Sequence, residues 1–153
     1  MEVYCFGNHH LHQIHQSGPE MSVAVLADTG PLYAAADPDD AHHARARREL
    51  GRLARDRIEV LIAYPTLLES YTLVLFRLGK PTASRWLEEV SATAALINPG
   101  PEDYRQAATR TRAFADQPIT LFDATVAVLA SRLQMEVWTY DHHFDLMRVP
   151  VWR

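Results

Sequence analysis

The chain contains, at residues 23–31, the stretch VAVLADTGP, in which an apolar run ends at a carboxylate and a helix start follows. The five apolar residues 23–27 predict a short buried strand. Pro31 fits the first turn of a helix, where its missing N–H is not needed. Asp28 lies between these two elements. An ionised carboxylate beside a core costs several kcal/mol unless it is paired, hydrogen-bonded or bound to a cation.

Three further acids stand in the same kind of context. Glu69 interrupts the apolar stretch YPTLLESYTLVLF (64–76), Asp123 interrupts ITLFDATVAVLA (119–130), and Asp141 follows VWTY (137–140). Because Lys and Arg are absent from all four stretches, a hard cation shared by the acids, Mg²⁺ or Mn²⁺, is the simplest common explanation.

Each acid also has an ordinary structural explanation. Asp28 fits a helix N-cap, and Asp123 has capping-box spacing from Thr120. Glu69 fits a solvent-facing helix position, and Asp141 fits a turn. These alternatives stay open for each residue taken singly, but the recurrence of one context at four places favours a common site.

Short apolar runs alternate with helical periods along the chain. We predict strands at 23–27, 59–63, 94–97 and 137–139, a short edge strand at 149–152, and helices opening near Pro31 and covering 41–55, 65–78, 81–90, 102–115 and 121–134. This alternation predicts an α/β fold with a central, mainly parallel sheet of four to five strands and helices on both faces. Functional sites of such sheets lie beyond the carboxyl ends of the strands, so Asp28 and Asp141 can converge.

Composition limits the class of protein. A chain of 153 residues with 48% apolar content fits one domain with a sizeable core. Cys5 is the only cysteine, which excludes an internal disulfide and a Cys-based zinc cluster and suits a reducing cytoplasm. We therefore expect a cytoplasmic protein, with no run near the ~20 apolar residues of a membrane span. The net charge of −4 argues against bulk electrostatic binding of nucleic acid, but bound metal ions would reverse the potential locally.

Residues 1–20 form a distinct segment, rich in histidine and without Lys or Arg. We interpret them as an N-terminal extension, either a tag or a misassigned start, and residues 21–153 as the domain. Whether the extension is native stays open at the level of sequence. Its histidines could bind a transition metal; they are His9, His10, His12 and His15.

A resemblance accompanies these patterns. The strings VLADTGPLYA (25–34), PTLLESYTLV (65–74), ITLFDATVAVLA (119–130) and VWTYDHHFD (137–145) resemble the four acidic motifs of the PIN-domain family, in particular of VapC-type toxins. The resemblance implies a PIN-like fold with acids at Asp28, Glu69, Asp123 and Asp141. It also implies a functional hydroxyl at Thr29. Thr139, Asp141 and Phe144 match the family's closing T-x-D-x-x-F motif, and Asp145 is a candidate auxiliary acid.

The resemblance also implies a function. A VapC-type protein is a metal-dependent endoribonuclease that hydrolyses RNA phosphodiester bonds with metal-activated water. The four acids would bind Mg²⁺ or Mn²⁺, since oxygen ligands suit hard ions, and the sequence offers no Cys/His site typical of zinc. Thr29 would bond the scissile phosphate or a water. The expected partners are RNA, a VapB-like antitoxin and a second copy of the chain.

Two questions of function stay open from the sequence. Because the chain is acidic overall, phosphate contacts must come from local cations, and we assign them to Arg110 and Arg112, with the arginines of residues 45–55 as a second group. A non-catalytic PIN-like module that binds RNA or a partner is the main alternative to an enzyme. A structure-specific DNA nuclease of the flap type is another, although it would usually need additional helical segments.

Overall fold

The computed structural model describes residues 3–4 and 23–153 of the chain. The elements follow in the order β1 (Val3–Tyr4), β2 (Ala24–Ala27), α1 (Thr29–Ala36), α2 (His43–Arg55), β3 (Glu59–Ala63), α3 (Tyr64–Leu78), α4 (Lys80–Thr93), β4 (Ala95–Ile97), α5 (Pro101–Ala113), α6 (Leu121–Leu133), β5 (Glu136–Trp138) and α7 (His143–Leu146). The predicted alternation is confirmed, with boundaries that agree within about one helical turn; α7 was not predicted.

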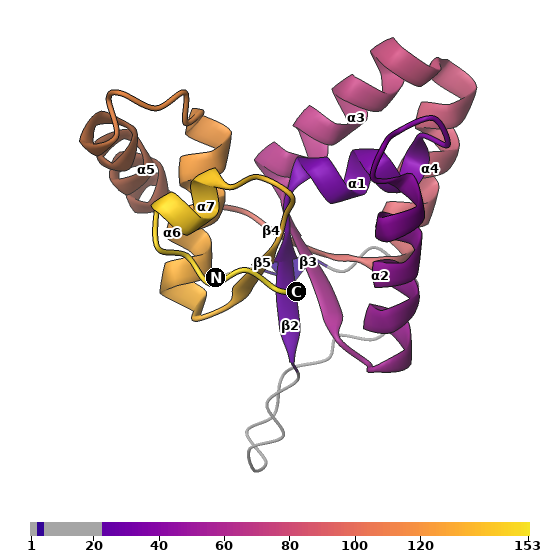
Figure 1. The fold of residues 1–153 in the computed structure, drawn as a ribbon, viewed down its shortest axis with the longest axis horizontal. Helices are drawn as coiled ribbons and strands as arrows, with labels where there is room; N and C mark the ends of the chain where they lie inside the picture. Colours follow the sequence, from indigo (N-terminus) through magenta and orange to yellow (C-terminus); the bar gives the residue numbers. More distant parts are fainter. Residues whose placement is uncertain (1–2, 5–22) are drawn as a thin grey trace.

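A five-stranded sheet with the order β1-β4-β3-β2-β5 forms the centre of the molecule (Figure 1). β4, β3, β2 and β5 run parallel, which confirms the predicted mainly parallel sheet. β1 pairs antiparallel with β4, in a segment where the sequence showed no strand period. The rest of the predicted extension, residues 1–2 and 5–20, lies outside the described residues.

The predicted edge strand at 149–152 was wrong. Val151 makes only an isolated parallel bridge with Val137. Pro150 has no N–H to donate and contributes only its carbonyl, which accepts from the Val137 amide at 2.9 Å, while the Trp152 amide donates to Val137 at 3.0 Å. The pairing therefore does not extend into a strand.

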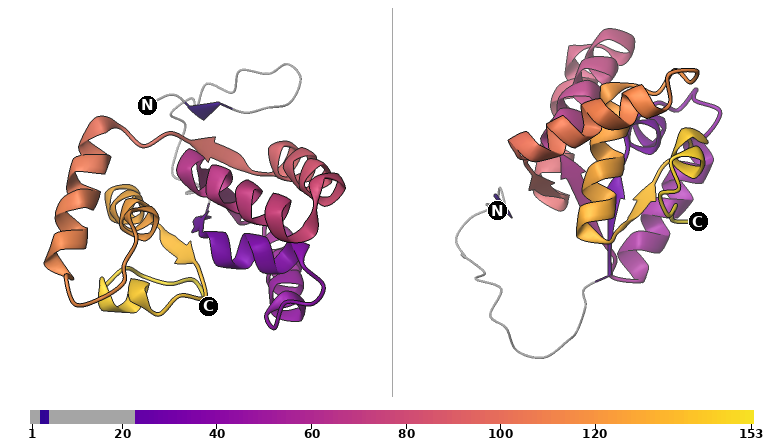
Figure 2. Two further views of the ribbon diagram at one scale, coloured as in Figure 1. Left: turned by 90° about the horizontal axis from the view of Figure 1, so that it is seen from above. Right: turned by 90° about the vertical axis from the view of Figure 1, so that its left-hand side faces the viewer.

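Helices cover both faces of the sheet. Figure 1 shows α1 to α4 on one side of β2 and α5 to α7 on the other, and Figure 2 shows α3 and α4 lying side by side. Alternate residues of β2 serve the two layers: Leu26 packs into the core under α5 to α7, whereas Val25 and Ala27 pack into the core under α1 to α4. A strand buried on both faces explains why residues 23–27 read as a continuous apolar run.

Glycine closes the longest helix as predicted. Gly79 has φ +84°, a conformation that other residues adopt only with strain, and its amide donates to the Leu75 carbonyl at the end of α3. Pro81 lies in the first turn of α4, which continues to Thr93, beyond the predicted end near residue 90. Within the described part of the chain, no helix is long and apolar enough to cross a membrane.

A buried ion pair joins α5 to α6. Arg132 donates to both carboxylate oxygens of Asp103, at 2.8 and 2.9 Å, and the Gly100 amide donates to the same carboxylate at 2.8 Å. Asp103 is 5% exposed. Burial pushes the pKa of Asp103 upward, but these donors outweigh it and the pKa is lowered. The pair shows how this chain compensates a buried carboxylate whose role is structural.

Removing the cation of this pair should destabilise the fold. In Arg132→Leu, Asp103 stays buried without its partner, and we expect the free energy of unfolding in urea to fall by about 2 kcal/mol. That is below the ~3–5 kcal/mol of a fully buried pair, because the Arg132 side chain is 39% exposed. Arg153→Leu is the control, since it removes an exposed pair with Asp145 and should cost under about 1 kcal/mol. Equal losses in the two variants would contradict the assignment.

Candidate active site

Two of the predicted acids, Asp28 and Asp141, lie just beyond the ends of parallel strands. Asp28 directly follows β2, and Asp141 follows β5 after two residues. Because β2 and β5 are neighbours in the sheet, their ends meet: the Asp28 amide donates to the Trp138 carbonyl at 3.0 Å. The Thr139 hydroxyl then donates to Asp28 Oδ2 at 2.8 Å and accepts from the Asp141 amide at 2.9 Å. Thr139 thus connects the first and fourth acidic motifs.

Asp28 is a buried carboxyl group in an unfavourable environment. It is 8% exposed, and burial raises its pKa from 3.8 to about 7. The hydrogen bond from Thr139 and the Thr29 amide lower the pKa, while the charges of Asp123 and Glu69 raise it further. Asp28 occupies the N-cap position of α1, but its side chain makes no capping hydrogen bond. The N-cap explanation therefore accounts for its position and not for its carboxylate.

Glu69 reaches the same place from α3. Its Oε2 accepts a hydrogen bond from the Thr29 hydroxyl at 2.5 Å. Partial burial raises the pKa of Glu69, the Thr29 hydroxyl lowers it, and the charge of Asp123 raises it. Ser70, which is fully buried, donates to the Thr29 oxygen at 3.4 Å. Sequence reasoning missed Ser70, because a serine in an apolar helix has no pattern that distinguishes it.

Asp123 forms the capping box that its spacing from Thr120 predicts. Its Oδ2 accepts from the Thr120 amide at 2.8 Å and from the Thr120 hydroxyl at 2.7 Å, and its own amide donates to the Thr120 hydroxyl at 3.1 Å. The capping box at the start of α6 is thereby confirmed. The same carboxylate is close enough to Asp28 and Glu69 to raise both of their pKa values. The cap therefore holds the Asp123 carboxylate within electrostatic range of Asp28 and Glu69.

Asp28, Glu69 and Asp123 differ from Asp103 in whether a cation offsets the charge of the carboxylate. Within residues 23–153, no ion pair includes Asp28, Glu69 or Asp123. Asp103 has an arginine and a lowered pKa, whereas Asp28 has two neighbouring acids and a raised one. Three carboxylates and a hydroxyl form an oxygen-only donor set, which fits a hard cation such as Mg²⁺ or Mn²⁺. Among the described residues, however, only Asp141, His142 and His143 place one ligand atom each within 4.8 Å of one another, so Asp28, Glu69 and Asp123 are not gathered around a single ion position in this structure.

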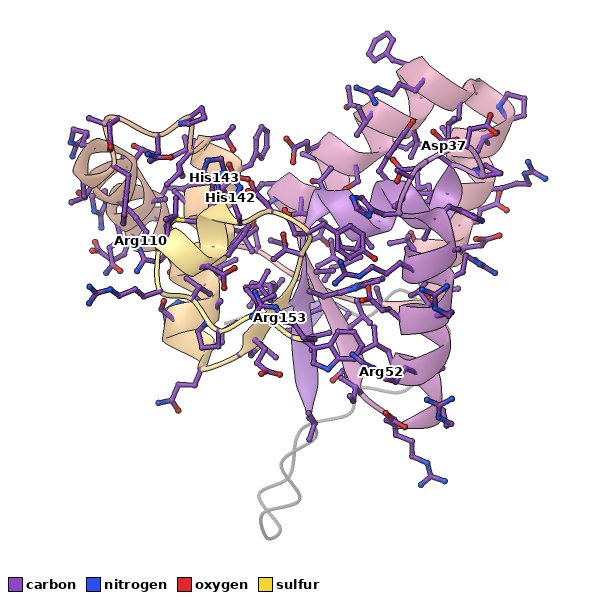
Figure 3. All side chains as sticks on the ribbon, in the orientation of Figure 1. Asp37, Arg52, Arg110, His142, His143 and Arg153 are labelled. Atoms are coloured by element: carbon purple, nitrogen blue, oxygen red, sulfur yellow. The ribbon has the colours of Figure 1, made fainter. Side chains whose placement is uncertain are left out.

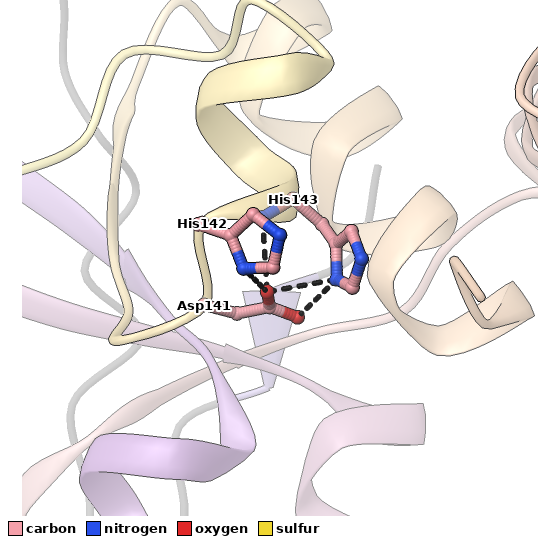
Figure 4. A group of neighbouring side chains, drawn as sticks. All are labelled: Asp141, His142 and His143. Carbon is pink, nitrogen blue, oxygen red and sulfur yellow. Dashed lines mark hydrogen bonds and ion pairs between the residues drawn. The ribbon is translucent and has the colours of Figure 1, made fainter. Parts of the chain in front are cut away.

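Asp141 is placed beside this group and makes different contacts. Its Oδ1 accepts from the His143 amide at 2.9 Å, as an ordinary turn residue does. The His143 ring Nδ1 lies 2.8 Å from Oδ1, and the His142 Nδ1 lies 3.6 Å from it (Figure 4). Among the described residues, the Asp141 backbone is joined to Asp28 through Thr139, and its carboxylate faces the two histidines.

The remaining predicted residues lie elsewhere. Asp145 forms an exposed ion pair with Arg153 and no hydrogen bond to the other acids within residues 23–153. Arg110 and Arg112 lie in the second half of α5, and Figure 3 shows Arg110 farther from α1 than His142 and His143. Arg110 lines a groove of about 650 Å³ between α5 and α6. No described hydrogen bond or ion pair joins either arginine to the acids.

Arg45, from the other predicted group of arginines, lies close to the segment that carries Asp141. The guanidinium of Arg45, on α2, lies 4.4 Å from the centroid of the Tyr140 ring, next in sequence to Asp141. Glu49 supports this arrangement by accepting from Trp138 at 2.7 Å, from the Tyr140 hydroxyl at 2.6 Å and from Arg45 at 2.9 Å. Burial raises the pKa of Glu49, but these donors outweigh it and the pKa is lowered. Nothing in the basic sequence of α2 indicates this role for Glu49.

Three solved structures show the same fold. A Mycobacterium tuberculosis toxin, VapC20, described as cleaving the sarcin-ricin loop, is 20% identical and has a TM-score of 0.73, over 84% of this chain and 98% of its own. Rickettsia felis VapBC2, bound to promoter DNA, is 16% identical with a TM-score of 0.67, over 86% and 98%. VapBC-1 of nontypeable Haemophilus influenzae is 13% identical with a TM-score of 0.63, over 86% and 97%. At these identities the likeness concerns the fold.

Comparison of the amino-acid sequence with family models identifies the family. No curated protein sequence matches this chain. The family model of the PIN domain, however, matches residues 25–149, a range that begins within β2, extends past α7 and contains all four acids. That match covers well over half of the chain and agrees with the fold and with the position of the acidic group. The chain therefore belongs to the PIN-domain family.

Proposed function

We propose that this protein is a metal-dependent endoribonuclease of the VapC type, which hydrolyses RNA phosphodiester bonds. The observation that carries the proposal is the buried Asp28 carboxyl group, which has two acids near it and, within residues 23–153, no ion pair with a cation. A purely structural role would favour compensation like that of Asp103, because uncompensated burial costs free energy. Membership of the PIN family and a fold shared with VapC toxins support the same conclusion.

The acids would hold the cation together. Asp28, Asp123 and Asp141 are the proposed ligands, and Glu69 is the ligand of a second ion or orients water. When bound, Mg²⁺ or Mn²⁺ would stabilise the negative charge on the phosphate and lower the pKa of water, so no side-chain nucleophile is needed. Thr139 positions Asp28 through its hydroxyl and Asp141 through its backbone.

Thr29 has a more specific part. Its hydroxyl carries a single hydrogen, which in this structure is donated to Glu69. We propose that Thr29 holds the orientation of Glu69 in the free protein and turns to a phosphate oxygen when RNA is bound. Ser70 is buried behind Thr29 and would continue to hold its oxygen.

An antitoxin and a second copy of the chain are the proposed protein partners. A groove of about 470 Å³ includes Glu69 in its lining; its other lining residues are Thr29, Phe122 and, from α3, Leu68, Thr72, Leu73, Phe76 and Arg77. Phe76 is 81% exposed and Leu68 is 63% exposed, which is a large apolar surface for a free monomer. We propose that a VapB-like antitoxin occupies this groove and covers the acids.

One assay separates the enzyme from a non-catalytic RNA-binding or partner-binding module. Total RNA is incubated with the protein and Mg²⁺, Mn²⁺ or EDTA, and the fragment ends are sequenced. Cleavage that needs the metal and leaves 5′-phosphate and 3′-hydroxyl ends supports the proposal. Binding without cleavage under all conditions would establish the module instead.

Metal binding should stabilise the protein. The acids repel one another, and a cation that binds among them would relieve this repulsion. If it binds only the folded state, it raises the free energy of unfolding by mass action, by about 2.7 kcal/mol at a hundredfold excess over its Kd. Thermal melts with and without Mn²⁺ measure this. The double variant Asp28→Asn/Asp123→Asn should show a much smaller shift, and an equal shift in the two proteins would place the metal elsewhere.

The substitution Asp28→Asn should abolish cleavage and stabilise the metal-free protein. Since the pKa of Asp28 is raised from 3.8 to about 7, the folded state holds a proton that the unfolded chain releases. Stability of the wild type therefore falls as pH rises from about 4 to about 7. In EDTA, the variant should exceed the wild type by a few kcal/mol at pH 8 and by almost nothing below pH 4.

A matched control uses the other buried aspartate. Asp103→Asn weakens the ion pair with Arg132, so it should lower stability at pH 8. Opposite signs for the same substitution at two buried positions would confirm that only Asp28 is uncompensated. If Asp28→Asn also lowers stability, Asp28 is a structural residue.

The predicted phosphate contacts are tested by salt dependence. Each contact to single-stranded RNA contributes roughly −0.7 to the slope of log K against log salt. In an Asp28→Asn background, Arg110→Ala/Arg112→Ala should weaken binding and flatten that slope, whereas Asp123→Asn should not flatten it. Arg45→Ala tests the arginine beside Tyr140 in the same way. An unchanged slope assigns that arginine to a solvated helix face.

A further inference from the structure

Asp141, His142 and His143 form a group with its own donor chemistry. One ligand atom from each residue lies within 4.8 Å of the other two. Figure 4 shows both imidazole rings beside the Asp141 carboxylate, with the ring centroids 4.3 Å apart. Their sequence gives no metal motif, since the three residues are consecutive, and the group becomes visible only through the turn that follows β5.

The donor set differs from that of the other acids. Two imidazole nitrogens and one carboxylate oxygen suit Zn²⁺ and similar first-row ions, whereas Mg²⁺ prefers oxygen alone. Bonds of ~2.0–2.1 Å in a tetrahedron place donors roughly 3.3 Å apart. Asp141 Oδ1 lies 3.6 Å from His142 Nδ1, near that value, and 2.8 Å from His143 Nδ1, which is a hydrogen-bond distance, so a bound metal would replace the proton between His143 and Asp141. The His142 side chain is 74% exposed and free to adjust.

We propose that Asp141, His142 and His143 form a second cation site, which takes Zn²⁺ or a similar transition metal and competes with the acidic site for Asp141. Three protein ligands leave a fourth position for water, as in open zinc sites. The competition rests on the proposed function, because it requires Asp141 to serve the Mg²⁺ or Mn²⁺ site as well.

The physical basis of the competition is that one carboxylate serves two donor sets. Thr139 fixes the Asp141 backbone next to Asp28, while the carboxylate of Asp141 faces the histidines. A nitrogen-containing site prefers Zn²⁺ to Mg²⁺, so the transition metal would hold the carboxylate in this orientation. Asp28, Glu69 and Asp123 would then lack Asp141 as the fourth metal-binding acid, and cleavage would stop without a large change in structure.

Binding is tested with Zn²⁺ alone. The full-length protein carries His→Ala substitutions at positions 9, 10, 12 and 15, which removes the other histidine-rich segment, and is titrated against a chromophoric chelator. We expect about one Zn²⁺ per chain. His142→Ala and His143→Ala should weaken binding by at least the ~10–100-fold typical of losing a residue that merely orients a ligand. His42→Ala, an exposed histidine outside the group, should bind as the parent does.

Unchanged Zn²⁺ affinity in His142→Ala would overturn the site. Because His142 is exposed, this variant should fold normally, so a negative result cannot be attributed to unfolding. Loss of binding in His143→Ala alone would also contradict a three-ligand site.

The competition is tested by RNA cleavage in Mg²⁺ with added Zn²⁺. With each protein's cleavage expressed relative to its own rate without Zn²⁺, His142→Ala should need about tenfold more Zn²⁺ than the parent for half inhibition. Equal inhibition of the two proteins would overturn the competition and place the inhibitory Zn²⁺ among the other acids. A protein that binds Zn²⁺ through both histidines but never cleaves RNA keeps the second site and loses the proposed function.

Discussion

The buried carboxyl group of Asp28 is the constraint on which the site depends. It lies at the end of a strand that is covered on both faces, and no arginine or lysine within residues 23–153 forms an ion pair with it. Two neighbouring acids add to the cost of its charge. The fold tolerates this cost because β2 is held by parallel neighbours on both sides and by two separate cores. Such a local penalty is typical of a site built for a ligand.

The parallel pairing of the strands places other functional candidates beside Asp28. Pairing of β2 with β5 brings Thr139 within hydrogen-bond distance of Asp28, although the two are more than a hundred residues apart. The helices contribute by where they start. The capping box of α6 fixes Asp123 at its first turn, and the contact between α1 and α3 lets Thr29 hold Glu69. Ordinary capping and pairing interactions therefore bring Asp28, Glu69 and Asp123 within electrostatic range of one another.

Asp141 is the point at which two kinds of chemistry meet. Its backbone belongs to the acidic group through Thr139, and its carboxylate belongs to the histidines that follow it. A hard cation and a nitrogen-preferring cation would require the same side chain in different orientations. The position of this carboxylate is therefore the most informative quantity to follow when metals are added.

Local sequence is enough to predict the α/β class and the mainly parallel sheet, and it singles out the four acids as candidates. Each of these predictions depends on one short segment. Examples are the apolar runs that end at Asp28 and Asp141 and the glycine, Gly79, that ends a helix. Which carboxylates have a cation beside them depends instead on contacts between distant segments: Asp103 is paired by Arg132, from a different helix, and no spacing predicts the pair. The same holds for the Asp141 carboxylate, whose orientation is set by hydrogen bonds in a turn. Pairing between distant segments depends on how the layers pack, and that information is absent from local sequence.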